Sequence, residues 1–254
     1  MDTDDKSCAT LASYTGEYGD NFELFEGETL MAGVSMSRSA QLVHVRFARP
    51  HRALSCAVLN GGFCHASDFL NVRVARHTPN PVEDPSRTLQ RWSDELQCRG
   101  VTVGMMTAAS LQSLRVAREE ICGETLAVLV TTGLENARRA GDPAEYRTLE
   151  VLPDQPGTIN LGIVTSARVA DTALVEMIAI ATEAKVATMQ ELDIMSPISG
   201  KLATGTGTDA IAVFSGDGTH HARFAGKHTV LGERLAILVM QAIRGSVNAQ
   251  QAAY

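Results

Sequence analysis

Short runs of apolar residues, separated by glycine, proline and asparagine, run through most of this sequence and predict strands. The predicted strands cover residues 42–47, 53–59, 69–74, 101–106, 114–118, 125–131, 157–165, 211–214 and 219–224. Turns such as Asn60-Gly61-Gly62 allow positive φ and join several of these runs directly. We therefore expect hairpin pairs of strands.

Apolar residues recur at helical spacing in three longer stretches, over residues 86–98, 169–192 and 229–244. A fourth, short helix is predicted over residues 133–140. Hairpin-like strand pairs mixed with strand–helix units favour an α+β fold. The expected architecture is a single domain with a mixed, mainly antiparallel sheet packed with helices as a layered sandwich.

The first forty residues differ from the rest of the chain. They are acidic and interrupted by Gly16, Gly19 and Gly27, so we expect an irregular N-terminal arm over residues 1–40. No change of composition marks a linker after that point. Residues 41–254 are therefore predicted to form a single domain.

The charge balance disfavours several kinds of partner. The 254 residues carry a net charge of −7, from 22 basic and 29 acidic side chains, whereas nucleic acids and anionic membranes attract basic surfaces. Apolar runs such as residues 235–240 are far too short to span a bilayer. The acidic N-terminus does not resemble a signal peptide. We expect a cytoplasmic protein without nucleic-acid or membrane partners, and a homo-oligomer stays open.

No motif for a metal or a cofactor stands out. The five cysteines are scattered and lack a C-x-x-C pair, which is typical of reduced thiols. His220 and His221 are adjacent in a predicted strand and would point to opposite faces. Nucleotide-binding glycine motifs and the serine-hydrolase elbow are also missing. The sequence therefore predicts neither a metal site nor a cofactor.

Residues 204–211, TGTGTDAI, are the most distinctive stretch of the sequence. Alternate threonines of an extended segment point the same way, so Thr204, Thr206 and Thr208 could offer three hydroxyls to one ligand. Asp209 follows where the apolar run begins. The alternative is a glycine-rich loop whose threonines bond their own backbone.

Further polar residues gather at the ends of predicted strands and in helices. Glu183 would be a general base if its helix buried it, and a solvated side chain otherwise. Lys227 and His228 precede a helix, where free N–H groups and the cation could stabilise an oxyanion while the imidazole transfers a proton. The alternative for this segment is a capped helix start with a solvated lysine.

These polar segments together resemble the adenosylcobinamide amidohydrolase family of cobalamin salvage. The matching motifs, in the family's order, are LSCAVLNGG (54–62), FLNV (69–72), MTAA (106–109), VTTGLENA (130–137), PGTIN (156–160), TEAK (182–185), ATGTGTDAI (203–211) and AGKHTVLGE (225–233). Each motif is weak alone, whereas the ordered set is specific. Only Thr132 departs from it, at a position where a smaller residue such as alanine is more common.

The resemblance implies hydrolysis of the amide between the aminopropanol arm and a corrin side chain, which yields adenosylcobyric acid and 1-amino-2-propanol. The corrinoid is then the substrate, not a cofactor. Expected catalytic residues are Glu183 or Asp209 to activate water, Lys227 for the oxyanion and His228 for the leaving amine. Expected substrate-binding residues are Asn60, Gly61, Gly62, Asn71, Thr107, Thr131, Asn136, Thr158, Asn160, Lys185, Thr204, Gly205, Thr206 and Thr208.

Three alternatives remain open beside this scheme. A threonine of the 204–208 turn could be the nucleophile. The chain could bind a corrinoid without cleaving it. It could also be a metal-dependent amidohydrolase that acts on another amide.

Overall fold

The structure of the protein is a computed structural model, which describes residues 10–15, 21–25, 27–74, 84–146, 148–149 and 158–251. The start of the expected arm (1–9) and Pro156-Gly157 of the PGTIN motif lie outside these residues.

One sheet of eleven strands forms the framework. Its strands are β1 (Thr10–Thr15), β2 (Asn21–Phe25), β3 (Thr29–Met31), β4 (Val34–Arg38), β5 (Leu42–Ser55), β6 (Gly62–Arg73), β7 (Val101–Thr107), β8 (Arg115–Ile121), β9 (Glu124–Thr132), β11 (Ile159–Thr165) and β14 (Ala210–Ser215). The pairs β6–β7 and β11–β14 are parallel and the other pairs are antiparallel. The mixed, mainly antiparallel sheet is confirmed.

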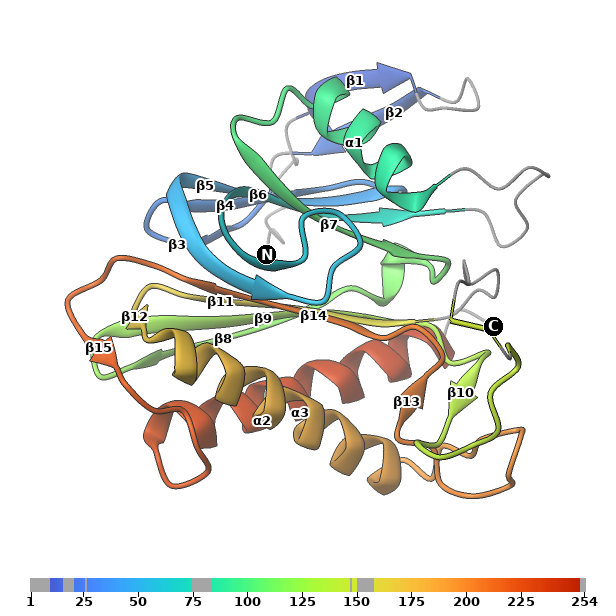
Figure 1. The fold of residues 1–254 in the computed structure, drawn as a ribbon. Coiled ribbons are helices and arrows are strands. Elements are labelled where there is room, and N and C mark those ends of the chain that lie inside the picture. The colour runs from blue at the N-terminus through green and yellow to red at the C-terminus, as the bar shows by residue number, and fades with distance from the viewer. Residues whose placement is uncertain are drawn as a thin grey trace, which may run out of the picture.

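Strand β5 turns this sheet back on itself. Its first part pairs with β4 and β6, its register with β6 shifts between Arg46 and His51, and its last residues pair with β14. The two halves of the sheet therefore face each other in a nearly barrel-shaped arrangement (Figure 1). The expected layered sandwich is not confirmed, because the two facing halves belong to one continuous sheet.

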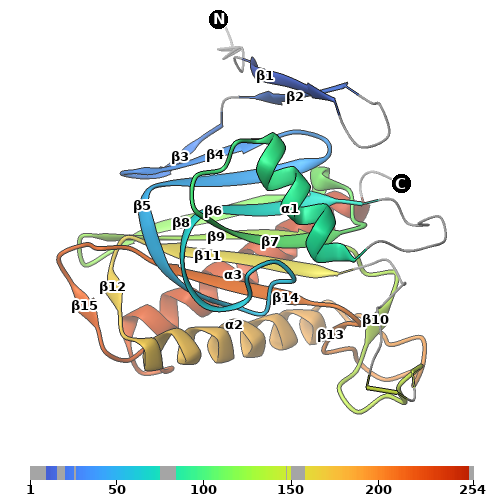
Figure 2. The same ribbon diagram turned by 45° about the horizontal axis from the view of Figure 1, so that its top comes forward.

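Three helices cover the outer faces of the sheet in the described part of the chain. Helix α1 (Pro85–Glu95) packs over β6 and β7, whereas α2 (Asp171–Glu191) and α3 (Val230–Gln251) lie beneath β8, β9, β11 and β14 (Figures 1 and 2). Helix α1 begins at Pro85. The carboxylate of the preceding Asp84 accepts a hydrogen bond from the Ser86 N–H and caps the helix. None of the described helices is long and apolar enough to cross a membrane.

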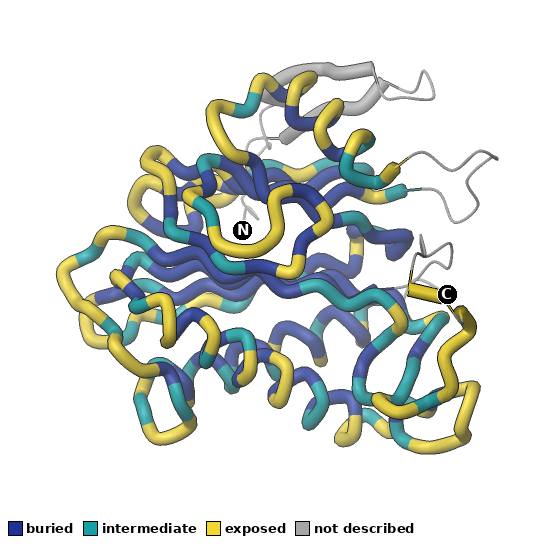
Figure 3. The backbone as a smooth tube through the Cα atoms, in the orientation of Figure 1, coloured by how far each residue is buried: buried dark blue, intermediate teal, exposed yellow. Residues whose placement is uncertain are grey.

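Three apolar clusters fill the space between these elements. The first lies between the sheet and α2 and α3, the second between the facing halves of the sheet, and the third beneath α1. Figure 3 shows the facing strands as the most deeply buried part of the backbone. This packing leaves the ends of the strands, with their loops, as the place for polar groups.

Some predicted elements were wrong. Residues 133–140 form a turn and the short strand β10 (Ala137–Arg138), which pairs with β13 (Gly205–Thr206), instead of a helix. Of residues 219–224 only β15 (His221–Ala222) is a strand, and it pairs with β12 (Arg168–Val169). The expected irregular arm contains the four strands β1 to β4, and buried side chains such as Leu30 and Val34 anchor β3 and β4 in the core.

Candidate active site

Two asparagines join the facing halves of the sheet at one end. Asn160 of β11 donates through Nδ2 to Asn71 Oδ1 of β6 and to the Met106 carbonyl oxygen, both at 2.8 Å. Asn71 Nδ2 in turn donates to Thr131 Oγ1 of β9 at 2.9 Å. All three side chains are buried, so these bonds satisfy amides that would otherwise be costly to bury.

Strand alternation explains why these side chains meet. Asn160 is opposite Thr131 in the β9–β11 register, so both point to the interior between the two halves of the sheet. Their neighbours Val130 and Leu161 point the other way, into the cluster between the sheet and helices α2 and α3. A small cavity lies beside the asparagines. Asn71, Thr131 and Asn160, which belong to three separate motifs of the sequence, are thus brought into one cluster.

Thr158 connects this cluster with the 204–209 turn. Its hydroxyl oxygen lies 3.1 Å from Asn160 Oδ1 and 2.6 Å from the carbonyl oxygen of Thr208. The side chain is buried. Residues 158–160 of the PGTIN motif and the TGTGTD motif are distant in sequence, and these hydrogen bonds join them in one site.

Asp209 is the most heavily bonded group of the turn. Its carboxylate accepts the Ile159 N–H at 3.0 Å, the Thr206 N–H at 3.1 Å and the Thr206 hydroxyl at 2.5 Å. The Lys185 ammonium completes the set with an ion pair to Oδ2. Both partners are nearly buried, with 9% and 12% of their side chains exposed. Asp209 therefore fixes both the turn and the lysine.

Two glycines of the turn leave room for this arrangement. A Cβ on Gly205 would lie 2.1 Å from Asp209 Oδ2 and 2.7 Å from Lys185 Nζ. A Cβ on Gly207 would lie 3.2 Å from Asn136 Nδ2, so Asn136 also belongs to this site. Asn136 Oδ1 is buried and has no hydrogen-bond partner among the described residues. It is an acceptor that a bound N–H group could satisfy.

Helix α2 separates the predicted catalytic residues. Lys185 points toward the sheet, whereas Glu183, two residues away, is exposed and forms an ion pair with the exposed Lys227. His228 is exposed beside Lys227 in the segment before α3. The structure therefore brings Asp209 and Lys185 together, and places Glu183, Lys227 and His228 on the solvent side of the helices.

Asn60, Thr107 and Thr204 form hydrogen bonds outside this network. Asn60 has a φ of 53° and donates to the Thr102 carbonyl oxygen, so the Asn60–Gly62 turn is held against β7. Thr107 Oγ1 accepts the Ala109 N–H, and Thr204 Oγ1 accepts the Ala140 N–H. Sequence reasoning missed the backbone groups of Met106 and Ile159, because a backbone contact has no residue-type signal.

Known proteins share features with this chain. The profile of the adenosylcobinamide amidohydrolase family matches residues 27–254. An uncharacterized protein of Methanocaldococcus jannaschii is 33% identical over 153 residues, which are 55% of this chain and 60% of the relative. An adenosylcobinamide amidohydrolase of Halobacterium salinarum is 32% identical over 154 residues, 59% of this chain and 60% of the relative.

The chain thus spans about 60% of the length of these two curated relatives. Among solved structures, a beta-aminopeptidase of Burkholderia sp. aligns with a TM-score of 0.43 and 16% identity, over 88% of this chain and 87% of that one.

Proposed function

The chain belongs to the adenosylcobinamide amidohydrolase family, and on that premise we propose that it hydrolyses the amide between the aminopropanol arm and the corrin side chain of adenosylcobinamide. The products are adenosylcobyric acid and 1-amino-2-propanol. The corrinoid is the substrate rather than a cofactor, and the reaction serves corrinoid salvage or remodelling.

The proposed site is based on the hydrogen bond from Thr206 to Asp209 and the ion pair of Asp209 with Lys185. A hydroxyl within 2.5 Å of a carboxylate, which is itself oriented by a third group, is the arrangement of an activated nucleophile. The neighbouring amides and hydroxyls suit a ligand with many primary amides. In this scheme Asn136 Oδ1, which has no hydrogen-bond partner among the described residues, accepts an N–H of a corrin side chain, whereas the buried Thr158 and Asn160 support the turn.

Thr206 Oγ1 attacks the carbonyl carbon of the substrate amide, and its proton passes to Asp209. The C–N bond then breaks, and the leaving amine takes the proton from Asp209 and departs as 1-amino-2-propanol. Water cleaves the resulting ester, which releases the carboxylic acid and restores the Thr206 hydroxyl. Lys185 keeps Asp209 in position, and N–H groups of the turn stabilise the oxyanion.

An alternative division of roles uses Asp209 or Glu183 to activate water, with Lys227 and His228 as oxyanion donor and acid. The Glu183–Lys227 pair is exposed, with 55% and 68% of the two side chains accessible. Exposed pairs of this kind contribute little to stability and exclude no water. The buried set around Asp209 is therefore our preferred centre.

The first test measures release of 1-amino-2-propanol from adenosylcobinamide by mass spectrometry, with and without a chelator. We expect Thr206→Val, which keeps the shape but removes the hydroxyl, to lower turnover by at least about 1,000-fold. Thr182→Val on the exposed side of α2 is the matched control and should keep the wild-type rate. Circular dichroism checks that each variant is folded.

Each other result has a defined meaning. Full activity of Thr206→Val together with loss in Glu183→Gln or His228→Ala would move the chemistry to the outer surface of α2. Loss on chelation would favour a metal-dependent amidohydrolase. Retained corrinoid without amine release would make the chain a binding protein. A covalent corrinoid adduct on wild type, absent from Thr206→Val, would support the ester intermediate.

A further inference from the structure

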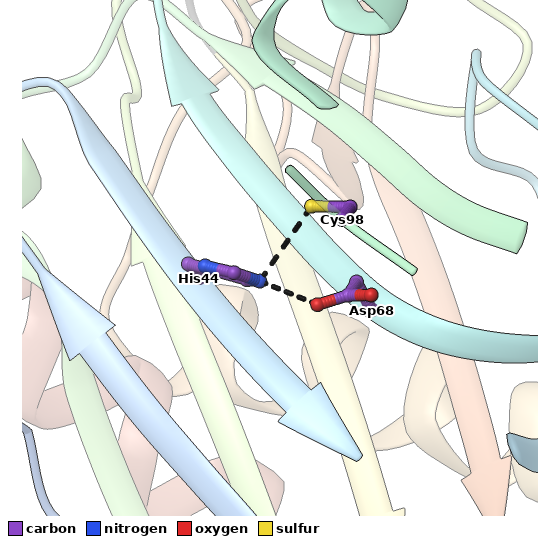
Figure 4. A group of neighbouring side chains, drawn as sticks. All are labelled: His44, Asp68 and Cys98. Carbon is purple, nitrogen blue, oxygen red and sulfur yellow. Dashed lines mark hydrogen bonds and ion pairs between the residues drawn. The ribbon is translucent and has the colours of Figure 1, made fainter. Parts of the chain in front are cut away.

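A second polar cluster lies beneath helix α1. Among the described residues, His44, Asp68 and Cys98 each bring one metal-ligating atom within 4.8 Å of the other two. His44 Nε2 lies 2.7 Å from Asp68 Oδ1 and 3.8 Å from Cys98 Sγ (Figure 4). His44 and Asp68 are buried, and Cys98 is partly buried.

This cluster is separated from the candidate active site by the sheet itself. In the β5–β6 register His44 is opposite Leu70, and both belong to the face that α1 covers. Asn71 is opposite Val43, which points into the core between the two halves of the sheet. Because successive side chains of a strand alternate between faces, the proposed hydrolysis does not use the His44 cluster.

The geometry differs from that of a catalytic Cys–His–Asp relay. A relay uses the two ring nitrogens of the histidine separately, one for the thiol and one for the carboxylate. Here the thiol and the carboxylate both approach Nε2 (Figure 4). Three different ligand atoms thus converge on one point, which is the geometry that binds a cation.

The backbone holds Cys98 in this position. Gln97 and Gly100, on either side, have φ values of 51° and 93°, and a Cβ on Gly100 would lie 2.6 Å from Ser67 Oγ. The Cys98 N–H donates to the Ser93 carbonyl oxygen at 3.0 Å. The Arg99 N–H also donates to Asp68 Oδ2, at 3.2 Å. The turn is therefore fixed to α1 at the thiol and to β6 directly after it.

We propose that the protein binds one Zn²⁺ ion through Cys98 Sγ, His44 Nε2 and Asp68 Oδ1, with water as the fourth ligand. A thiolate, an imidazole and a carboxylate are the ligand types that zinc combines in proteins. The ion would join the turn after α1 to β5 and β6. This proposal is independent of the proposed amide hydrolysis.

Only small movements are needed to admit the ion. Tetrahedral zinc with ligand distances of about 2.0–2.3 Å places nitrogen and oxygen roughly 3.3 Å apart and nitrogen and sulfur roughly 3.6 Å apart. The distance from His44 Nε2 to Asp68 Oδ1 is 2.7 Å here, so it must increase when the ion binds. The distance from His44 Nε2 to Cys98 Sγ is 3.8 Å here, so it must decrease slightly.

Binding also moves protons. Burial, and next the charge of Asp68, raise the pKa of the Cys98 thiol, so the free site holds a thiol proton that zinc must displace. Hydrogen bonds from Ser93 and Thr102 and the charge of Arg46 act in the opposite direction.

The test uses the full chain, free of any tag and stripped with a chelator. Calorimetric titration with Zn²⁺ should give one ion per chain, and Co²⁺ should give a sulfur-to-metal charge-transfer absorption. Cys98→Ser should abolish this absorption and weaken zinc binding by at least about 100-fold. Cys122→Ser removes an exposed cysteine outside the cluster and should behave as wild type.

X-ray absorption of the zinc-loaded wild type gives a second result that depends on no variant. We expect one sulfur scatterer at about 2.3 Å together with nitrogen and oxygen ligands. A wild-type chain that takes up no zinc, a spectrum without sulfur, or unchanged zinc binding by folded Cys98→Ser would each overturn the proposal.

Discussion

At the residue scale, the tightest constraint on the candidate site is the absence of a side chain at Gly205. The space that a Cβ would need is occupied by Asp209 Oδ2 and Lys185 Nζ. No strained φ is involved, because glycine is required here only for its size. The position therefore tests the importance of the Asp209–Lys185 pair without touching either residue.

We predict that Gly205→Ala lowers the turnover of adenosylcobinamide by about 100-fold, since a displacement of about 1 Å at a catalytic group has this effect. The measurement is amine release at saturating substrate. Gly226→Ala is the matched control, because a Cβ at this position would meet no described atom within 4 Å. Equal activity of the two variants would show that catalysis does not depend on the position of the Asp209–Lys185 pair.

Sequence reasoning identified the residues of this pair but not their relation. The motifs named Lys185 and Asp209. Side chains two positions apart on a helix, such as those of Glu183 and Lys185, point in different directions. Which of the two faces the core could not be derived, because the apolar pattern of α2 is nearly uniform around the helix. His44, Asp68 and Cys98 had no signal at all, since they lie far apart in sequence and meet only in the fold.

At the element scale, the loops beside the site depend on a carboxylate outside it. Asp142 Oδ2 accepts the Ser196 hydroxyl at 2.5 Å and the Arg139 N–H at 2.9 Å, which ties the segment after β10 to the segment after α2. The hydrogen bond from Ser196, with one from Ser199, lowers the pKa of Asp142 from 3.8 to about 2. The folded state therefore favours the ionised carboxyl.

This shift gives a pH dependence with a definite sign. The stabilisation by Asp142 is complete above the unfolded pKa of 3.8 and is lost as the pH falls toward 2. We predict that wild type melts at a higher temperature than Asp142→Asn at neutral pH, and that the difference closes over this acidic range. Asp217→Asn, at an exposed surface pair, should show no such closing gap. A difference in melting temperature that does not change with pH would contradict the assignment of this stabilisation to the ionised Asp142 carboxylate.

The prediction of elements failed where local pattern and tertiary pairing disagree. Residues 133–140 contain good helix formers, but Gly133 and Asn136 interrupt them, and Ala137–Arg138 pairs with Gly205–Thr206. A bonding partner so distant in sequence cannot be inferred from the neighbouring residues. The long helices and the hairpin β8–β9 were predictable because their patterns are local and strong.

At the scale of the whole molecule, an aromatic group holds the two halves of the sheet together. Phe214 of β14 is completely buried, and its ring lies 5.0 Å from Phe47 and 5.3 Å from Phe69, between ring centroids. These three rings come from both halves of the sheet. They form the centre of the core on which the position of the candidate site depends.

We predict that Phe214→Ala lowers the free energy of unfolding by about 3–5 kcal/mol, because a large cavity forms in a closely packed core. Denaturant unfolding followed by circular dichroism measures this change. Phe224→Ala, at a side chain that is 62% exposed, should stay within about 0.5 kcal/mol of wild type. A small loss in Phe214→Ala would mean that the two halves of the sheet are held together elsewhere.

The bend of β5 has a consequence for the order of folding. The hairpin of β5 with β6 joins neighbouring parts of the chain. The end of β5 instead lies beside β14, where Cys56 and Ile211 form a hydrogen bond although they are 155 positions apart. Contacts between such distant positions form late, since a long loop must close first. Asp209 lies immediately before β14, so the chain acquires a competent site only when this slow closure is complete.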